Sequence, residues 1–164
     1  GDKFDWVVQK AVELGVYRIV PVMMKRCVSR PDAKSMKKKV ERWQKIAEEA
    51  AKQSGRGILP QVGELLPFTK AVEEAAAEQD QNGAEKAVSL LFYEGGGERI
   101  LRLAGEQTKY ASIFIGPEGG FDPAEVELAL EKGIRAATLG PRILRTETAP
   151  IAALAALMQA TGNL

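Results

Sequence analysis

The sequence of 164 residues predicts one α/β domain with a mostly parallel sheet that helices cover on both faces. Two compact apolar runs, residues 88–92 and 111–115, have the length and the bounding residues of buried strands. Helical patterns alternate with such runs along the chain, as in folds built from βαβ units. With 45% hydrophobic and 27% charged residues, the composition is that of a soluble globular domain able to bury a core.

The first third of the chain alternates a helix, a strand and a long helix. Residues 5–14 carry apolar side chains at helical spacing, and residues 17–22 are rich in β-formers. Residues 35–54 predict a charged helix with a single apolar stripe. Trp6 and Trp43 lie on these stripes, so we expect them to pack in the core or against a second subunit.

The middle of the chain continues the alternation. A connection rich in glycine and proline over residues 55–68 holds at most a short strand at 59–62. An alanine-rich helix follows over residues 69–79. A helix near residues 98–104 lies between the two buried strands, which completes a βαβ unit.

The clearest boundary in the sequence is the start of a helix at Asp122. Asp122 is an N-cap residue, Pro123 stands at the first helical position, and Glu125 completes a capping box. A short strand at residues 136–139 follows. Pro150 then opens a last helix whose apolar face suits either the core of this chain or a dimer interface.

Charge is distributed unevenly along the chain. Residues 1–60 carry 14 Lys and Arg against 7 Asp and Glu, whereas residues 61–164 carry 9 against 15. The basic residues are densest between positions 25 and 56, as expected of a face that meets phosphates. Nucleic acid is therefore a candidate partner, and a solvated helix face is the alternative.

Residue usage excludes several kinds of chemistry. The chain has no histidine and one cysteine, Cys27, so the usual zinc sites, Ser-His-Asp triads and an internal disulfide are ruled out. We expect no metal site. No apolar run reaches the roughly 20 residues of a membrane helix, and the first residues lack the features of a signal peptide. We therefore expect a cytoplasmic protein without a membrane partner.

The loop GPEGGF at residues 116–121 follows a buried strand and precedes the helix capped at Asp122. Its glycines allow close approach of a ligand to the backbone, and the helix start offers amide donors. The spacing is not that of a phosphate loop, and Glu118 would repel phosphate, so a neutral or cationic ligand is favoured. The alternative is an ordinary tight turn between strand and helix.

The loop LGPRILRTETA at residues 139–149 precedes the last helix. Apolar Ile143 and Leu144, followed by polar side chains, suit a pocket that binds an aromatic ring and presents Arg and Glu to a substrate. The alternative is ordinary capping, in which Thr146, Thr148 and Glu147 simply start the helix that follows.

Four blocks of sequence together carry a resemblance. QKAVELGV at residues 9–16, EEAAKQSGR at residues 48–56, GPEGGF and LGPRILRTETA are similar, in this order, to blocks of the 16S rRNA uridine-N3 methyltransferases (the RsmE family) of the SPOUT class. The resemblance implies a C-terminal trefoil knot that binds S-adenosylmethionine, releases S-adenosylhomocysteine and acts in a homodimer. The implied reaction is methylation of N3 of a uridine in 16S rRNA of the small ribosomal subunit.

The family also carries an N-terminal β-barrel that binds RNA. This chain opens directly with the QKAVELGV region, so we expect residues 1–164 to be the methyltransferase domain, with the barrel absent. The resemblance assigns the cofactor to the two loops. The expected cofactor-binding residues are Gly116, Pro117, Gly119, Gly120, Leu139, Gly140, Leu144, Arg145, Thr146 and Ala149. Glu94, after the first buried strand, is expected to face the same cleft, or else to be a solvated carboxylate.

Uridine N3 must lose a proton before it can attack a methyl group. Because the chain has no histidine, we hypothesise that Glu147 or Glu118 accepts this proton. Alternatively, water takes the proton and Arg145 stabilises the uridine anion. Arg26 and Arg56 are our candidates for binding RNA phosphates. The alternative function is a non-catalytic RNA-binding module that uses the basic first third.

Overall fold

The computed structural model describes residues 2–164 and places the predicted buried strands side by side. Its main sheet has the strand order β6-β8-β5-β7, with every neighbouring pair parallel. The strands are β5 (Ala87–Phe92), β6 (Glu98–Arg99), β7 (Tyr110–Ile115) and β8 (Arg135–Thr138). The predicted α/β class with a parallel sheet is confirmed.

Two further pairs of short parallel strands lie beside the main sheet. They are β1 (Arg18–Ile19) with β3 (Gln61–Val62), and β2 (Val22–Met23) with β4 (Leu66–Pro67). The prediction of one strand over residues 17–22 is wrong, because buried Pro21 has no N–H to donate and divides the segment into β1 and β2.

Six helices are present in residues 2–164. They are α1 (Asp2–Glu13), α2 (Ala33–Gln53), α3 (Phe68–Asn82), α4 (Ile100–Leu103), α5 (Pro123–Glu131) and α6 (Ala149–Ala160). The helix predicted over 98–104 is shorter than expected, because Glu98 and Arg99 pair with β8 as strand β6. The other predicted helices are confirmed, with ends that differ by a few residues.

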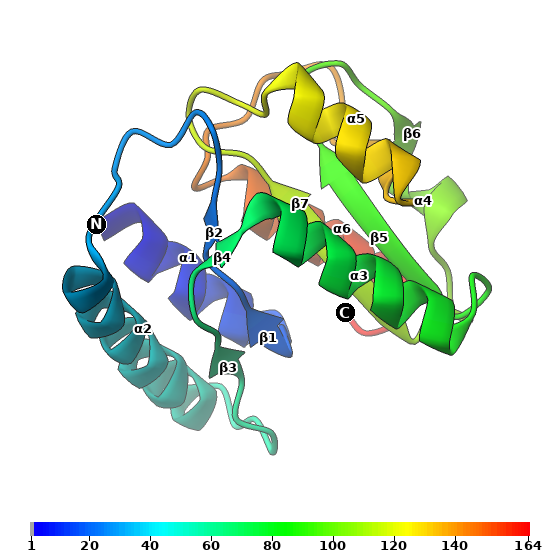
Figure 1. Ribbon diagram of the computed structural model, residues 1–164. Helices are drawn as coiled ribbons and strands as arrows, with labels where there is room; N and C mark the ends of the chain where they lie inside the picture. Colours follow the sequence, from blue (N-terminus) through cyan, green and yellow to red (C-terminus); the bar gives the residue numbers. More distant parts are fainter. Residues whose placement is uncertain (1) are drawn as a thin grey trace.

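Helices cover both faces of the main sheet, as predicted (Figure 1). Adjacent residues of β5 show this directly, because Leu90 and Leu91 are both fully buried but belong to different clusters. Leu91 packs with Val126 of α5 and residues of α3, whereas Leu90 packs with Leu157 of α6 and residues of α4. Burial of each leucine stabilises the fold by about 1.5–3 kcal/mol.

Helices α1 and α2 form a separate layer beside the sheet (Figure 1). Trp43 is buried there, and its indole N–H donates to Asp5 Oδ1 at 3.1 Å, so its predicted packing is confirmed. Trp6 remains 44% exposed, and its predicted packing in the core of this chain is wrong. The turn of α1 directs Val8 and Val12 into the cluster and leaves Trp6 in an open groove between α1 and α2.

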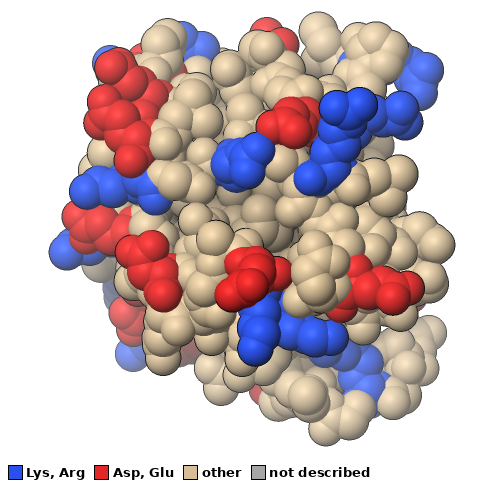
Figure 2. Space-filling model, turned by 90° about the vertical axis from the view of Figure 1, so that its right-hand side faces the viewer, with Lys and Arg blue, Asp and Glu red and all other residues tan. Residues whose placement is uncertain are grey.

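The surface of the main-sheet side carries mixed charges. Figure 2 shows the face at the right of Figure 1, where Lys and Arg groups are interspersed with Asp and Glu groups among uncharged residues. The basic excess of the first third instead includes exposed side chains of α2. They are Lys34, Lys37, Lys38, Arg42, Lys45 and Lys52. Within residues 2–164, no helix combines the length and the apolar character that crossing a membrane requires.

Gly97 brings the chain close to the backbone of β8. A Cβ at this position would lie 2.4 Å from the carbonyl carbon and oxygen of Ala136 and 2.6 Å from the nitrogen of Ala137. Only a residue without a side chain therefore lets the chain enter β6 beside β8.

Gly97→Ala should destabilise the protein by about 1–3 kcal/mol, because the added methyl group must displace the backbone of β8. Chemical denaturation of the variant and the wild type measures the difference. The matched control is Gly57→Ala, where nothing lies within 4 Å of the added carbon. Equal stability of the two variants would contradict the proposed contact.

Candidate functional site

The carboxyl ends of three neighbouring strands meet at one edge of the main sheet. Phe92 of β5 pairs with Ile115 of β7 on one side and with Ala137 of β8 on the other. The segments that follow these strands therefore leave the sheet from one row of residues. In parallel α/β sheets, this edge is where ligands bind.

The loop after β7 is held in a tight conformation by its glycines. Gly120 has φ +76°, a left-handed value that glycine adopts without strain, and its N–H donates to the carbonyl of Pro117 at 2.8 Å. A Cβ at Gly116 would lie 3.2 Å from the ring of Phe121. Phe121 is buried in the core, so the loop is folded onto a fixed base.

The loop after β8 presents backbone donors that the protein itself does not use. Gly140 turns the chain with φ +104°, and Ile143 projects with 82% of its surface exposed. Among the side chains of residues 3–164 and the backbone of residues 2–164, the N–H groups of residues 142–147 have no acceptor. A row of free amide donors beside an exposed apolar side chain is suited to a ligand that has both polar and aromatic parts.

Thr146 connects the two loops. Its hydroxyl oxygen lies 3.3 Å from Glu118 Oε1 and 3.4 Å from Glu147 Oε2, so two predicted catalytic carboxylates are brought to one side chain. Lys3 Nζ, from the start of α1, lies 3.8 Å from the same Glu147 oxygen. Thr148, the N-cap of α6, makes no side-chain cap hydrogen bond, so its side chain does not cap the helix.

Arg145 and Glu94 are exposed at the same edge of the sheet. The carbonyl of Arg145 accepts from the N–H groups of Thr148 and Ala149, each at 2.9 Å, which fixes its backbone at the start of α6. In the described part of the chain, neither side chain has an ion-pair partner. Both are therefore available to a ligand or substrate.

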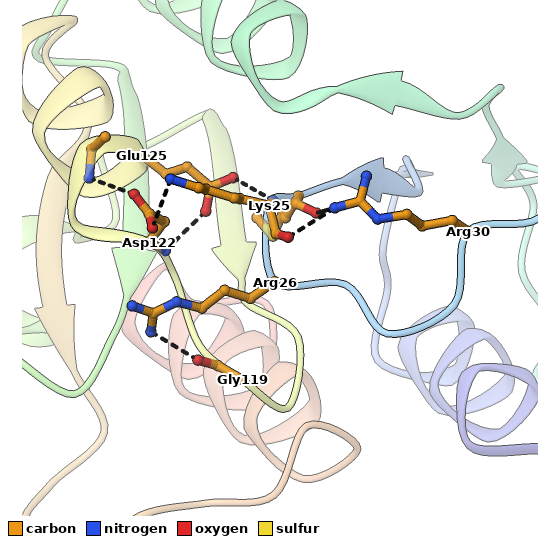
Figure 3. Close-up of polar contacts among 8 residues, drawn as sticks. Lys25, Arg26, Arg30, Gly119, Asp122 and Glu125 are labelled. Carbon is orange, nitrogen blue, oxygen red and sulfur yellow. Dashed lines mark hydrogen bonds and ion pairs between the residues drawn. The ribbon is translucent and has the colours of Figure 1, made fainter.

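The basic segment before α2 contacts the glycine loop (Figure 3). Arg26 Nη1 donates to the carbonyl of Gly119 at 3.0 Å, and the N–H of Lys25 donates to Glu125 Oε2 at 3.1 Å. Lys25 Nζ also lies 3.4 Å from Asp122 Oδ2. Sequence reasoning missed these contacts because they join segments about 95 residues apart, and no local pattern records such a pairing.

Arg56, the second candidate for RNA binding, has a structural contact that the sequence did not reveal. Its Nη1 donates to the carbonyl of Val16 at 2.5 Å and to that of Val12 at 3.4 Å. These carbonyls lie at and beyond the end of α1, where helical partners are missing. Arg56 therefore ties the chain after α2 to the end of α1.

Asp122 caps α5 as predicted, and the capping box is complete. Its Oδ1 accepts from the N–H of Ala124 at 3.0 Å, and its own N–H donates to Glu125 Oε1 at 2.9 Å. The hydrogen bond from Ala124 is the main cause of a lowered pKa for Asp122, with a further contribution from the charge of Lys25. In residues 2–164, no group of three or more acidic or cysteine side chains is placed to hold a metal ion.

Comparison with known proteins assigns the chain to a family. A family model described as an RNA methyltransferase domain matches residues 1–158. The chain belongs to the RNA methyltransferase domain family. The resemblance predicted from four sequence blocks is thereby confirmed.

Curated relatives in this RNA methyltransferase family carry a common name. Ribosomal RNA small subunit methyltransferase E of Bacillus subtilis is 40% identical over 163 residues, which are 98% of this chain and 62% of that protein. The protein of the same name from Aquifex aeolicus is 34% identical, over 94% of this chain and 62% of its own length. This chain thus spans about three fifths of the length of these relatives.

Solved structures of RNA methyltransferase relatives have the same fold. A putative methyltransferase from Legionella pneumophila, solved with bound S-adenosylmethionine, has a TM-score of 0.86 and 34% identity, over 98% of this chain and 62% of that one. Ribosomal RNA small subunit methyltransferase E of Neisseria gonorrhoeae was also solved with bound S-adenosylmethionine. It has a TM-score of 0.80 and 36% identity, over 97% of this chain and 61% of that one.

Asp122→Asn should make the stability of the protein less dependent on pH. Because folding lowers the pKa of Asp122, its ionised form adds stability that is complete above about pH 4, the ordinary value, and is lost as the pH falls through the lower folded value. The variant should be less stable than the wild type at pH 7, and the gap should close toward pH 2.5.

Urea denaturation at both pH values measures this gap. The control Asp80→Asn removes one exposed carboxylate from α3, far from this cap in sequence. If the deficit of Asp122→Asn were the same at pH 7 and pH 2.5, the capping carboxylate would not be its source.

Proposed function

We propose that this chain is the catalytic domain of an S-adenosylmethionine-dependent methyltransferase that modifies N3 of a uridine in 16S rRNA. One observation carries the proposal: the loops after β5, β7 and β8 leave one sheet edge, where the N–H groups of residues 142–147 donate to no acceptor in the described part of the chain. Membership of the RNA methyltransferase family and two relatives solved with this cofactor support it.

The residues at the sheet edge fit this cofactor. The free N–H groups after β8 and the carbonyls of the glycine loop match its adenine, ribose and amino-acid groups, and Ile143 offers apolar contact. The holding residues are those of the two loops, namely Gly116, Pro117, Gly119, Gly120, Leu139, Gly140, Leu144, Arg145, Thr146 and Ala149, with Glu94 beside them. When bound, S-adenosylmethionine supplies a methyl group activated by its positive sulfonium.

The two carboxylates around Thr146 are suited to the proton on uridine N3. Glu147 is the better sheltered, with 25% of its side chain exposed, and Thr146 and Lys3 hold its carboxylate in place. We infer that Glu147 accepts the proton and that Arg145 stabilises the negative charge left on the base. Glu118, more exposed and bonded to Thr146, is the second candidate for proton acceptor.

The RNA backbone is assigned to the basic first third of the chain. The exposed lysines and arginines of α2, continued by the partly buried Arg56, supply the positive charges that phosphates require. A non-catalytic RNA-binding module is the competing function. The two carboxylates positioned at the sheet edge favour the enzyme, because carboxylates repel phosphates.

We further infer that residues 1–164 form one methyltransferase domain that acts as a cytoplasmic homodimer with a C-terminal trefoil knot. The family resemblance supports the dimer and the knot. In α6, Ile151 and Met158 are only half-buried within this chain, as expected of residues beside a subunit interface.

Gly140→Ala should weaken binding of S-adenosylhomocysteine about tenfold or more, because alanine is strained at φ +104° and the loop after β8 must change shape. Isothermal titration calorimetry measures the affinity, with ATP as the ligand that should not bind. The control Gly83→Ala places the same strain, at φ +85°, at the opposite edge of the sheet. A wild-type domain that is folded and binds no S-adenosylhomocysteine would refute the proposed cofactor.

Glu147→Gln should lower the rate of methyl transfer by about 10²–10⁴-fold while leaving S-adenosylhomocysteine affinity unchanged, because it removes only the proton acceptor. Single-turnover transfer of labelled methyl groups to unmodified 16S rRNA or small subunits, followed by nucleoside mass spectrometry for 3-methyluridine, provides the readout. Glu131→Gln, at the exposed end of α5, is the control. RNA binding without transfer by the wild type would favour the binding module.

A further inference from the structure

A short segment between β2 and α2 spans the gap to the glycine loop. We name this segment, Met24 to Arg30, the basic strap. Its contacts with the loop region come from both backbone and side chains, and Figure 3 shows Lys25 and Arg26 directed toward residues on either side of the start of α5. Arg26 reaches the loop itself, whereas Lys25 reaches the helix cap behind it.

The contact of Arg26 with the loop is close and specific. Its Nη1 donates to the carbonyl of Gly119 at 3.0 Å. A Cβ at Gly119 would lie 3.2 Å from Arg26 Cβ and 3.7 Å from its Cδ, so the stem of the arginine packs along the loop backbone. A guanidinium turned freely to solvent for phosphates would make neither contact.

The strap is itself braced in the conformation that presents Arg26. Arg30 Nη2 donates to the carbonyl of Lys25 at 2.8 Å and to that of Met24 at 3.4 Å, and the N–H of Met24 donates to Cys27 Sγ at 3.4 Å. Met24 is buried in the core cluster that also contains Phe121. The two segments therefore share one rigid base.

We propose that Arg26 is a positioning residue that holds the glycine loop, through the carbonyl of Gly119, in the shape that receives the cofactor. The inference rests on the proposed function, since it takes residues 116–120 as part of the cofactor site. It changes the role expected for Arg26, from binding RNA phosphates to ordering the loop.

The physical reason lies in the composition of the loop. Three of residues 116–120 are glycines, which lose more conformational freedom on ordering than any other residue. A charge-assisted hydrogen bond at Gly119, the most exposed of them, restricts the loop before the ligand arrives. Such preorganisation lowers the entropy cost of binding.

The test compares Arg26→Ala, Arg26→Lys and the wild type by calorimetric titration with S-adenosylhomocysteine. Arg26→Ala should weaken the affinity for S-adenosylhomocysteine on the order of tenfold. Arg26→Lys should recover part of the lost affinity, because lysine still donates one hydrogen bond. Amide hydrogen exchange of residues 117–121 should speed up in Arg26→Ala. The KM for S-adenosylmethionine should rise while kcat is kept.

Arg18→Ala is the matched control, because Arg18 is an exposed arginine paired with Glu74, away from the loop. It should leave affinity and exchange at residues 117–121 unchanged. Unchanged S-adenosylhomocysteine affinity in Arg26→Ala, with weaker RNA binding and a smaller salt dependence, would overturn the proposal and return Arg26 to the phosphates. A wild type that binds no S-adenosylhomocysteine would instead refute the proposed function. In that case, faster amide exchange of residues 117–121 in Arg26→Ala than in the wild type would still show that the basic strap orders the loop.

Discussion

The in-register parallel pairing of β5 with both β7 and β8 is the constraint on which the rest of the molecule depends. Phe92 stands opposite Ile115 and opposite Ala137, so three loops must leave from one row. Parallel pairing is stable only when both faces of a sheet are buried, which is why β5 carries Leu90 and Leu91 into separate cores. The same pairing that builds the core thus assembles the candidate site.

Contacts between loops turn this common edge into an ordered site. Thr146 reaches Glu118 and Glu147, and Arg26 reaches the carbonyl of Gly119. Each of these polar contacts is exposed or partly buried and is worth little by itself. Their effect is to reduce the number of shapes that glycine-rich loops adopt, which matters more for binding than for stability.

The predictions from sequence succeeded where the signal was local. The capping box at Asp122, the buried run of β5 and the start of α6 are each encoded within a few neighbouring residues. The run at 111–115 forms the strand β7 as predicted, but its predicted burial is wrong, because β7 is an edge strand in which only Phe114 is buried. The predictions failed where a distant partner decides. Residues 98–99 form a strand only because β8 lies beside them. Trp6 is exposed because α1 directs Val8 and Val12 into the cluster with α2 and leaves Trp6 in the open groove between the two helices.

The sequence by itself determined the α/β class, the order of the main elements, the family and the loops that carry the candidate site, because hydrophobic periodicity, caps and motifs are written along the chain. Only the tertiary structure decided which polar groups meet. Arg26 and Gly119 are 93 positions apart, and Arg56 and Val16 are 40 apart, so their pairing follows from how strands and helices pack. Arg26 and Arg56, the two arginines expected at RNA phosphates, each donate to a backbone carbonyl of the protein itself.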